Sequence, residues 1–371
     1  MVATGSIYDL IVVGGGPAGA AAAITAVRKG ARVMLLERGR FPRHKVCGEF
    51  VSAESLDLLA GLLDSQHASI LQTAIRIPRA RAFIDGCALP IPVHPPAASI
   101  SRLDLDAALW EVAENSGVEV RPQITVKTVT GSSPFRATTS TGVFDALAVI
   151  NASGRWSNLG LIPGNHGKHP KKWLGLKAYY AEDSPPLSAD LYFFEGGYCG
   201  VQPVDLRDEE SKCGRVNACA MVNPDVASSL SEVFAQHPDL WRRSRGWRQL
   251  GDAVSTSPLI FRDPEPLRDG ILLAGDAAGF VDPFVGDGIS LALRSGALAA
   301  ESLERLFRNQ ASLQECSNHY RRLYDERLAR VFRNSAKIRR ALDLPRALRV
   351  PVVSLLLSFP VAARFMVRKT R

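Results

Sequence analysis

The sequence has 371 residues, of which 46% are hydrophobic and 22% are charged. This balance is typical of a soluble globular protein and excludes bulk disorder, and at roughly 150 residues per domain the length predicts two domains. The net charge of +8 is uneven, because residues 301–371 carry 16 Lys or Arg against 6 Asp or Glu, and the near-neutral remainder argues against a nucleic-acid-binding body.

The first predicted elements form a β-α-β unit. Residues 7–13 are an apolar run that ends in glycines, which is typical of a buried parallel strand. Residues 17–30 are Ala-rich and predict a helix that ends at Gly30, and residues 32–36 predict a second strand. A unit of about 30 residues in this order is the usual start of a Rossmann-type domain.

A glycine motif lies at the first turn of this unit. Gly14, Gly16 and Gly19 have the G-x-G-x-x-G spacing, and Glu37 follows Gly19 by eighteen residues, at the tip of the second strand. In this motif the glycines allow a tight turn, close approach of a pyrophosphate and close packing of helix on strand. The helix start offers free N–H groups to phosphate, and Glu37 would accept hydrogen bonds from ribose hydroxyls and disfavour NADP.

The middle of the chain changes in character. Residues 103–116 predict an amphipathic helix, followed by a strand at 118–126 and a small β-meander over 125–150 whose last strand is 146–151. Between 165 and 260, short β-like runs at 174–181, 190–195 and 215–222 alternate with Pro, Gly and Ser turns. This texture predicts a sheet that covers a substrate.

A second glycine motif follows the strand predicted at 271–274. It runs through Gly275, Asp276 and Gly279 to Pro283, Gly286, Gly288 and Ile289, where a long helix is predicted from about 287. Asp276 is placed to hold a ribityl hydroxyl, and the N–H groups at the helix start could stabilise negative charge on a reduced flavin. The pairing of the two motifs favours FAD over NAD.

The C-terminal part, residues 300–371, is predicted to be mostly helical. Its apolar stretch at 350–363 has 14 residues without charge and contains Pro360, which is too short for the 20 or so residues of a membrane-spanning helix. Either these helices pack over the sheet and wall a substrate tunnel, or they lie at a membrane interface with basic residues at anionic lipid.

The cysteines and histidines indicate no metal site. The six cysteines form no CxxC pair or zinc spacing, and the pair His166 and His169 lies in a polar loop that favours solvent. We expect reduced thiols and a cytoplasmic protein, with no signal peptide before the first strand.

Three segments resemble a known family. They are the motif from Gly14 to Glu37, Arg102, and the run 275–296. Together they resemble the p-hydroxybenzoate hydroxylase-type superfamily of FAD-dependent oxidoreductases. Within it, the run 275–296 and the segment Arg43-His-Lys-Val-Cys-Gly48 are similar to the geranylgeranyl reductase-like branch. The resemblance implies an α/β fold with an α+β lid. A Rossmann-type FAD-binding domain (1–75, 99–164 and 262–305) is interrupted by a mixed β-sheet substrate domain (76–98 and 165–261), and C-terminal helices follow (306–371).

The motifs and the resemblance together predict the site. Cys47 and Tyr198 are the candidate catalytic residues, since a thiol near the flavin ring could tune it or donate a proton. The expected FAD-binding residues are Gly14, Gly16, Pro17, Ala18, Gly19, Glu37, Arg38, Cys47, Gly48, Arg102, Gly154, Gly275, Asp276, Pro283, Gly286, Gly288 and Ile289.

The chain departs from its relatives in the predicted substrate region. Ser153 stands where hydroxylases of the superfamily carry an Asp, in the segment 151–157 that is associated with FAD and NAD(P)H. Gly200 and Gln202 replace the Trp and Phe of the reductase pocket motif, which removes apolar area beside Tyr198. The Trp-x-Trp-x-x-Pro run of flavin halogenases is absent, so halogenation is disfavoured.

The sequence thus predicts an FAD-dependent reductase or dehydrogenase of a lipophilic, isoprenoid-like or polyketide-like molecule. The alternative is a monooxygenase that hydroxylates an aromatic substrate with NAD(P)H and O₂, and a quinone-linked electron-transfer flavoprotein is a further one. Because no second Rossmann motif exists, NAD(P)H would visit transiently or a protein would donate electrons. Expected partners exclude nucleic acid and include peripheral membrane contact through the basic C-terminal region.

Overall fold

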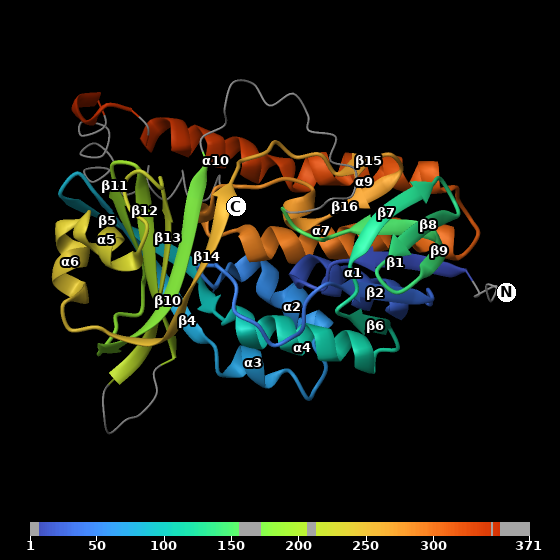
Figure 1. Ribbon diagram of the computed structural model, residues 1–371, viewed down its shortest axis with the longest axis horizontal. Helices are drawn as coiled ribbons and strands as arrows, with labels where there is room; N and C mark the ends of the chain where they lie inside the picture. Colours follow the sequence, from blue (N-terminus) through green and yellow to red (C-terminus); the bar gives the residue numbers. More distant parts are fainter. Residues whose placement is uncertain (1–6, 156–171, 206–212, 343, 349–371) are drawn as a thin grey trace.

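The computed structural model describes residues 7–155, 172–205, 213–342 and 344–348. Two layered bodies lie side by side along the long axis of the molecule (Figure 1). Several predictions fall outside the described residues: the end of the 151–157 segment, the pair His166 and His169, and the apolar stretch at 350–363.

The first sheet is the core of the nucleotide-type body. Its central strands are parallel, in the order β16-β9-β1-β2-β6, with β15 antiparallel at one edge and a β7–β8 hairpin joined to β9. The strands are β1 (Tyr8–Val13), β2 (Val33–Glu37), β6 (Glu119–Pro122), β7 (Val126–Gly131), β8 (Phe135–Thr139), β9 (Val143–Asn151), β15 (Leu267–Arg268) and β16 (Ile271–Leu273).

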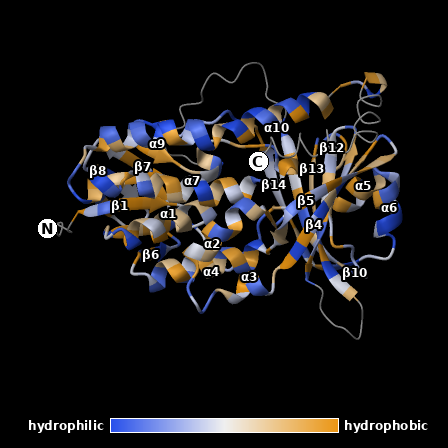
Figure 2. Ribbon diagram, turned by 180° about the vertical axis from the view of Figure 1, so that it is seen from behind, coloured by the Kyte–Doolittle hydropathy of each residue, from blue (hydrophilic) through white to orange (hydrophobic). Residues whose placement is uncertain are grey.

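Alternation along β1 explains how this sheet is covered. Leu10 and Val12 belong to a core shared with three helices, whereas Ile11 and Val13 pack against the β7–β8 hairpin. Because both faces are buried, the central strands are apolar throughout, and they are among the most hydrophobic segments in Figure 2. The three helices are α1 (Pro17–Arg28), α4 (Arg102–Asn115) and α7 (Gly288–Ser302).

The second sheet forms the other body. Its order is β14-β10-β13-β12-β11-β4-β5-β3, antiparallel except for the parallel pair β11–β4. One face packs on α5 (Leu230–Ala235) and α6 (Pro238–Ser244), and the other faces the first body. The strands are β3 (Phe50–Val51), β4 (Ile75–Ile84), β5 (Cys87–Ser99), β10 (Trp173–Asp183), β11 (Ala189–Phe194), β12 (Gly197–Asp205), β13 (Cys213–Val222) and β14 (Arg248–Leu259).

The C-terminal helices contact both bodies. In α9, Tyr320 is buried and donates a hydrogen bond to the carbonyl of Leu273, and α10 continues from there to the second sheet (Figure 1). No helix among the described residues is long and apolar enough to cross a membrane. The remaining helices are α2 (Leu56–Leu62), α3 (Ser69–Gln72), α8 (Glu304–Phe307), α9 (Leu313–Arg327) and α10 (Ala329–Leu342), with short 3₁₀ turns at Ala53–Ser55, Gly275–Ala277 and Pro283–Val285.

The structure confirms the predicted fold class, an α/β body joined to a mixed sheet, and differs in detail. Helices α5 and α6 lie in the range 165–260, for which only short strands and turns were predicted. The strand predicted at 118–126 ends at Pro122, because a turn with Gln123 at φ 60° separates β6 from β7. Strand β3 pairs with the second sheet although it lies in the range expected for the FAD-binding domain.

Candidate functional site

A cavity of about 1000 Å³ lies between the carboxyl ends of the first sheet's strands and the inner face of the second sheet. This is the usual place for a ligand in an open α/β sheet. The structure brings all but one of the predicted site residues to its wall: Gly14, Gly16, Pro17, Ala18, Glu37, Arg38, Cys47, Gly48, Arg102, Gly154, Tyr198, Gly275, Asp276, Pro283, Gly286, Gly288 and Ile289. The exception is Gly19.

Gly19 shapes the first glycine turn from behind. A Cβ at Gly19 would lie 1.7 Å from the carbonyl oxygen of Gly14, which itself has φ 102°. The absence of both side chains therefore lets α1 begin directly against β1. Pro17 has no N–H, so the groups at the start of α1 without a partner in the helix are the N–H groups of Gly16, Ala18 and Gly19, and these are available to an anion.

Glu37, at the end of β2, is held as an anion. It accepts hydrogen bonds from the N–H groups of Gly15 and Gly39, each at 2.8 Å, and from Arg43 at 2.9 Å. Burial alone would raise the pKa of Glu37, but Arg43 and the two N–H groups outweigh it, so the pKa lies below its usual value. With three of its roughly four acceptor sites in use, the carboxylate keeps one for a ribose hydroxyl.

Arg43, Lys45 and Arg102 form a positively charged part of the wall. Burial, and after it the neighbouring charges of Arg43 and Arg102, lower the pKa of Lys45 to about 8. A bound phosphate would offset this repulsion, so the site suits the pyrophosphate of a dinucleotide.

We predict a pH dependence of cofactor binding from Lys45. Below pH 8 its ammonium is charged in the free protein, whereas above pH 8 binding of an anion must take up a proton. The affinity for FAD should therefore fall as the pH rises from 7 through about 8 and beyond. Fluorescence titrations of FAD into apoprotein between pH 7 and 9.5 measure this.

The matched control for Lys45→Met is Lys127→Met, since Lys127 is exposed on β7 outside the cavity. The Lys45→Met protein should bind FAD more weakly at pH 7 and show a flatter pH profile, and the control should follow the unmodified protein. An unchanged profile in Lys45→Met would contradict the assignment.

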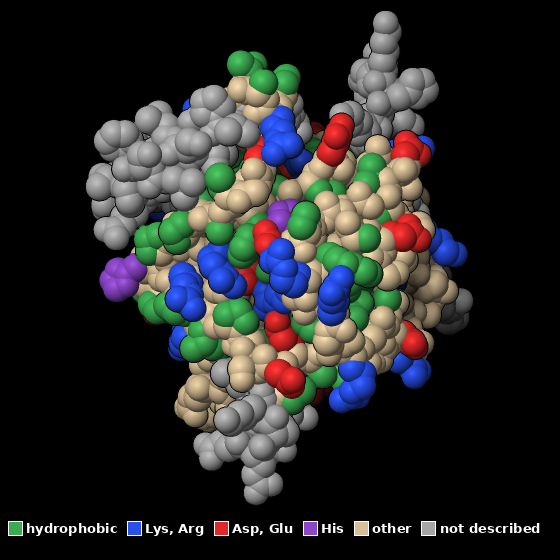
Figure 3. Space-filling model, turned by 90° about the vertical axis from the view of Figure 1, so that its left-hand side faces the viewer, with side chains coloured by type: hydrophobic (Ala, Val, Ile, Leu, Met, Phe, Trp, Pro, Cys, Tyr) green, Lys and Arg blue, Asp and Glu red, His purple; other side chains and the backbone are tan. Residues whose placement is uncertain are grey.

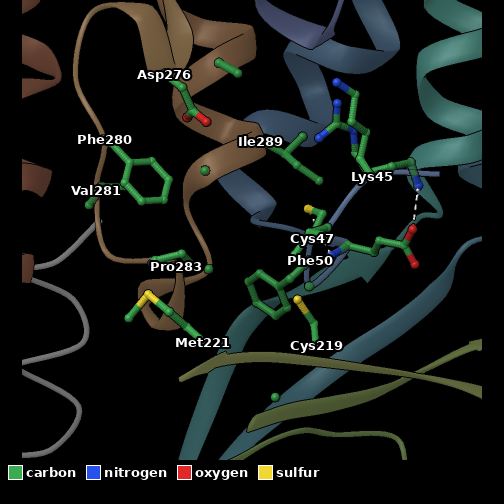
Figure 4. Close-up of a pocket in the computed structure, with 18 of the residues that line it drawn as sticks. Lys45, Cys47, Phe50, Cys219, Met221, Asp276, Phe280, Val281, Pro283 and Ile289 are labelled. Carbon is green, nitrogen blue, oxygen red and sulfur yellow. Dashed lines mark hydrogen bonds between the residues drawn. The ribbon is translucent and has the colours of Figure 1, made fainter. Parts of the chain in front are cut away.

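The second glycine motif lies opposite Lys45 and Cys47 in the cavity, with Asp276 and Phe280 on its wall (Figure 4). Gly275 has φ 59° and donates its N–H to Ser295 at 2.8 Å, and Gly286 has φ 77°. Both are left-handed conformations that favour glycine. They turn the chain so that α7 begins at Gly288 with its N-terminus at the cavity.

Three glycines in the cavity wall leave room beside the backbone for a large planar cofactor. A Cβ added at Gly48, Gly154 or Gly288 would meet no atom within 4 Å, although all three line the cavity. The backbone there borders open space, as a site for close approach of a ligand requires. The residues present therefore fit FAD, and we expect its dinucleotide end at α1 and Glu37 and its flavin end at the α7 N-terminus.

Arg102 is anchored by its own helix. It donates two hydrogen bonds to the buried carboxylate of Asp106, at 2.7 and 2.6 Å, and lies within hydrogen-bonding reach of the Cys47 thiol. The Cys47 sulfur also accepts the N–H of Glu49 at 3.3 Å, and its carbonyl accepts the side chain of Asn217 at 2.9 Å. These contacts fix the loop that carries Cys47.

A buried charge cluster beside Cys47 was missing from the sequence prediction. Glu49 is fully buried and Lys177 is 1% exposed, and their side chains meet at 2.5 Å. Glu49 also accepts hydrogen bonds from the Tyr179 hydroxyl at 2.8 Å and the Arg102 N–H at 2.8 Å. The cluster joins the loop that carries Cys47 to strand β10. The one sequence signal for it was Lys177, a charged residue in an otherwise apolar strand.

Cross-strand pairing arranges the inner face of the second sheet in rows. Tyr198 pairs with Met221, Gly200 with Cys219, and Gln202 with Asn217. Lys177 and Tyr179 extend the second and third rows. The face therefore changes from aromatic and apolar at Tyr198 to polar at Gln202, whose side chain donates to Ser99 at 2.7 Å. Gly200 adds no side chain to the middle row, and Cys219 and Met221 both point into the cavity, Cys219 toward Phe50 and Met221 beside Pro283 (Figure 4).

Tyr198 lies near a second buried ion pair. Its hydroxyl donates to Asp282 at 3.5 Å, and Asp282 is paired with Arg339 of α10. Burial raises the pKa of Asp282 to about 6 against the effect of Arg339, and burial raises the pKa of Tyr198 well above its usual value. Tyr198 therefore keeps its proton, and α10 is tied to the loop that precedes α7.

One arm of the cavity is lined almost entirely by aliphatic side chains; we call it the aliphatic arm. It lies between the second sheet and the end of α10. Its residues are Ala80, Ala82, Ile84, Leu89, Ile91, Val93, Leu191, Ile338, Ala341 and Leu342.

Comparison with known proteins assigns the cofactor and the enzyme class. Residues 9–48 match the family model described as FAD dependent oxidoreductase. FAD is the cofactor that this match assigns to the chain, and oxidoreductase is its enzyme class. The chain is also 28% identical over 370 residues to a protein named menaquinone reductase of Mycolicibacterium smegmatis, covering 92% of this chain and 86% of that one.

Two solved structures share the fold. A geranylgeranyl bacteriochlorophyll reductase-like protein of Thermoplasma acidophilum has a TM-score of 0.74 at 21% identity, covering 98% of this chain and 96% of that one. A flavin-dependent brominase has a TM-score of 0.77 at 19% identity, covering 98% and 93%. The fold is therefore common to reductase-like and halogenating flavoproteins, and the branch is not decided by it.

Proposed function

We propose that this protein is an FAD-dependent reductase or dehydrogenase of the geranylgeranyl reductase-like branch, acting on a lipophilic small molecule of isoprenoid or polyketide character. The observation that carries the proposal is the continuity of the cavity, from the glycines expected to hold FAD to the aliphatic arm. An apolar ligand in that arm gains about 25 cal/mol for each Å² of apolar surface buried. The relative named menaquinone reductase supports a substrate of this class.

The residues of the chain would bind and orient the reactants. When bound, FAD supplies the two-electron redox chemistry. The α7 N-terminus offers N–H groups to negative charge at the flavin end. We propose that Tyr198, which keeps its proton, turns its hydroxyl from Asp282 to donate to a substrate oxygen, and that Cys47, beside Arg102, is the second catalytic candidate.

The electron donor in this proposal is NAD(P)H visiting transiently, or a protein donor. The test uses the protein after anaerobic reduction of its flavin, mixed with menadione as the first probe, and follows reoxidation by absorbance. Stoichiometric reoxidation without O₂ supports a reductase. Equimolar consumption of NAD(P)H and O₂, with one oxygen added to an aromatic product, would instead establish the monooxygenase alternative and contradict the proposal.

We predict that Gly200→Phe selects against long substrates. A Cβ at Gly200 would already lie 3.4 Å from Leu191, so a phenyl ring must extend into the cavity. Turnover of a quinone with a long isoprenoid tail should fall about tenfold relative to tail-less menadione, because tenfold is about 1.4 kcal/mol and one lost methylene contact costs roughly 1–3 kcal/mol. Steady-state kcat/KM for the two quinones measures this.

The control for Gly200→Phe is Gly246→Phe, which adds the same ring at a glycine outside the cavity, with open space around it. FAD content should be unchanged in both variants. Equal effects on the two quinones in Gly200→Phe would show that the tail does not pass this residue.

For location, we propose a cytoplasmic protein with peripheral membrane contact through the basic C-terminal region. Nucleic acid is not among the proposed partners.

A further inference from the structure

Helix α10 carries a line of basic side chains on its exposed side; we call it the basic stripe. Arg330, Arg333, Lys337 and Arg340 are spaced by three, four and three residues, so they lie on one helical face. All four are exposed, none makes an ion pair with another described residue, and the helix contains no Asp or Glu. A stripe of this kind without acidic partners attracts anions.

The same helix walls the substrate side of the cavity. Ile338, Ala341 and Leu342 line the aliphatic arm, and Lys337 lies at its edge as part of the stripe. Arg346, just beyond the helix, reaches Asp85 at the tip of the β4–β5 hairpin at 3.7 Å. The stripe and part of the cavity wall therefore belong to the same helix, which lies over the second sheet (Figure 1), and Lys337 belongs to both.

Exposed apolar side chains follow the stripe. Leu344 is 38% and Leu348 is 59% exposed, and they are two of six large hydrophobic side chains exposed among the described residues. Figure 3 views the molecule from the end where the second sheet lies, and basic, acidic and hydrophobic side chains are interspersed on that face. Adjacent cationic and apolar side chains are typical of surfaces that lie in a membrane interface.

We propose that the basic stripe and Leu344 and Leu348 dock this protein on an anionic lipid surface, so that a lipophilic substrate passes from the bilayer into the aliphatic arm. The inference rests on the proposed function for its substrate. Charge complementarity identifies the surface, and the exposed leucines favour lipid over nucleic acid, which offers no apolar phase. Because the basic stripe lies beside the aliphatic arm, docking of the stripe on a membrane would bring the arm close to a lipophilic substrate in the bilayer.

The test compares the full-length FAD-bound protein on vesicles of phosphatidylcholine with and without phosphatidylglycerol, by co-sedimentation. The variant Arg330→Gln/Arg333→Gln/Arg340→Gln removes three stripe charges. Its control, Arg242→Gln/Arg245→Gln/Arg248→Gln, removes three exposed charges at α6 and the start of β14. Each basic residue near an anionic surface is worth about fivefold in partitioning, so the stripe variant should bind about a hundredfold more weakly.

The expected result is binding to anionic but not neutral vesicles, weakened by salt, lost in the stripe variant and kept in the control. Equal binding of stripe variant and control overturns the inference, as does no binding by the unmodified protein. Binding to duplex DNA at the same salt as tightly as to vesicles overturns it too. Reoxidation of the reduced flavin by detergent-dispersed menadione tests the proposed function separately, and it should be equal in all three proteins.

Discussion

Replacing Lys177 by Met should lower the free energy of unfolding by about 3–5 kcal/mol, the usual cost of removing one member of a buried ion pair. Glu49 would remain fully buried without its ammonium partner and keep only the Tyr179 hydroxyl and the Arg102 N–H as donors. Two donors do not replace the charge, because the carboxylate has been removed from water. Urea denaturation followed by circular dichroism measures the loss.

Two further variants separate charge from packing. Lys127→Met removes an exposed Lys from strand β7 and should change stability by about 0.5 kcal/mol at most. The double variant Glu49→Gln/Lys177→Met removes both charges and should recover much of the loss, since a Gln can still accept from Tyr179 and Arg102. A Lys177→Met protein as stable as Lys127→Met would show that the pair does not support the fold.

The second large effect is expected at Gly19. The Cβ of Gly19→Ala would lie 1.7 Å from the Gly14 carbonyl oxygen, and real Cβ contacts are essentially never under 3.0 Å, so α1 and β1 must separate by about 1.3 Å. That movement opens the turn expected to hold the pyrophosphate. A misplacement of about 1 Å lowers the reaction rate on the order of a hundredfold in other sites, which shows how sensitive such geometry is. The purified variant should therefore carry little FAD.

Gly61→Ala is the matched change. Gly61 lies in α2 with open space around its Cα, so an added methyl should stabilise the helix by up to about 1 kcal/mol and leave FAD content unchanged. Isothermal titration of FAD into both apoproteins gives the two affinities. If Gly19→Ala binds FAD as tightly as Gly61→Ala, the first glycine turn does not hold the cofactor.

The two glycine motifs could be predicted because each is local in sequence. Gly14, Gly19 and Glu37 belong to one β-α-β unit, and Gly275 to Ile289 to a strand, turn and helix start, so spacing alone places them at the carboxyl ends of parallel strands. The same reasoning missed α5, although Ser229 accepts the N–H of Glu232 there, a capping pair visible as Ser-x-x-Glu.

The polar contacts across the two bodies could not be predicted. Glu49 and Lys177 are 128 residues apart, and Asp282 and Arg339 are 57 apart. Such pairs depend on how the second sheet and α10 fold back over the first body, which periodicity does not reveal. Lys177 in an apolar strand signalled an inward charge, but not its partner.

The central claim is that the cavity holds FAD, and the most direct test is the purified protein itself. The visible absorbance spectrum, followed by heat release and mass identification of the bound molecule, should show an oxidised flavin at one FAD per chain. In Glu37→Ala and Asp276→Ala, folded protein should have lost it. A colourless protein that takes up no added FAD, or one that keeps full FAD in both variants, would contradict the account.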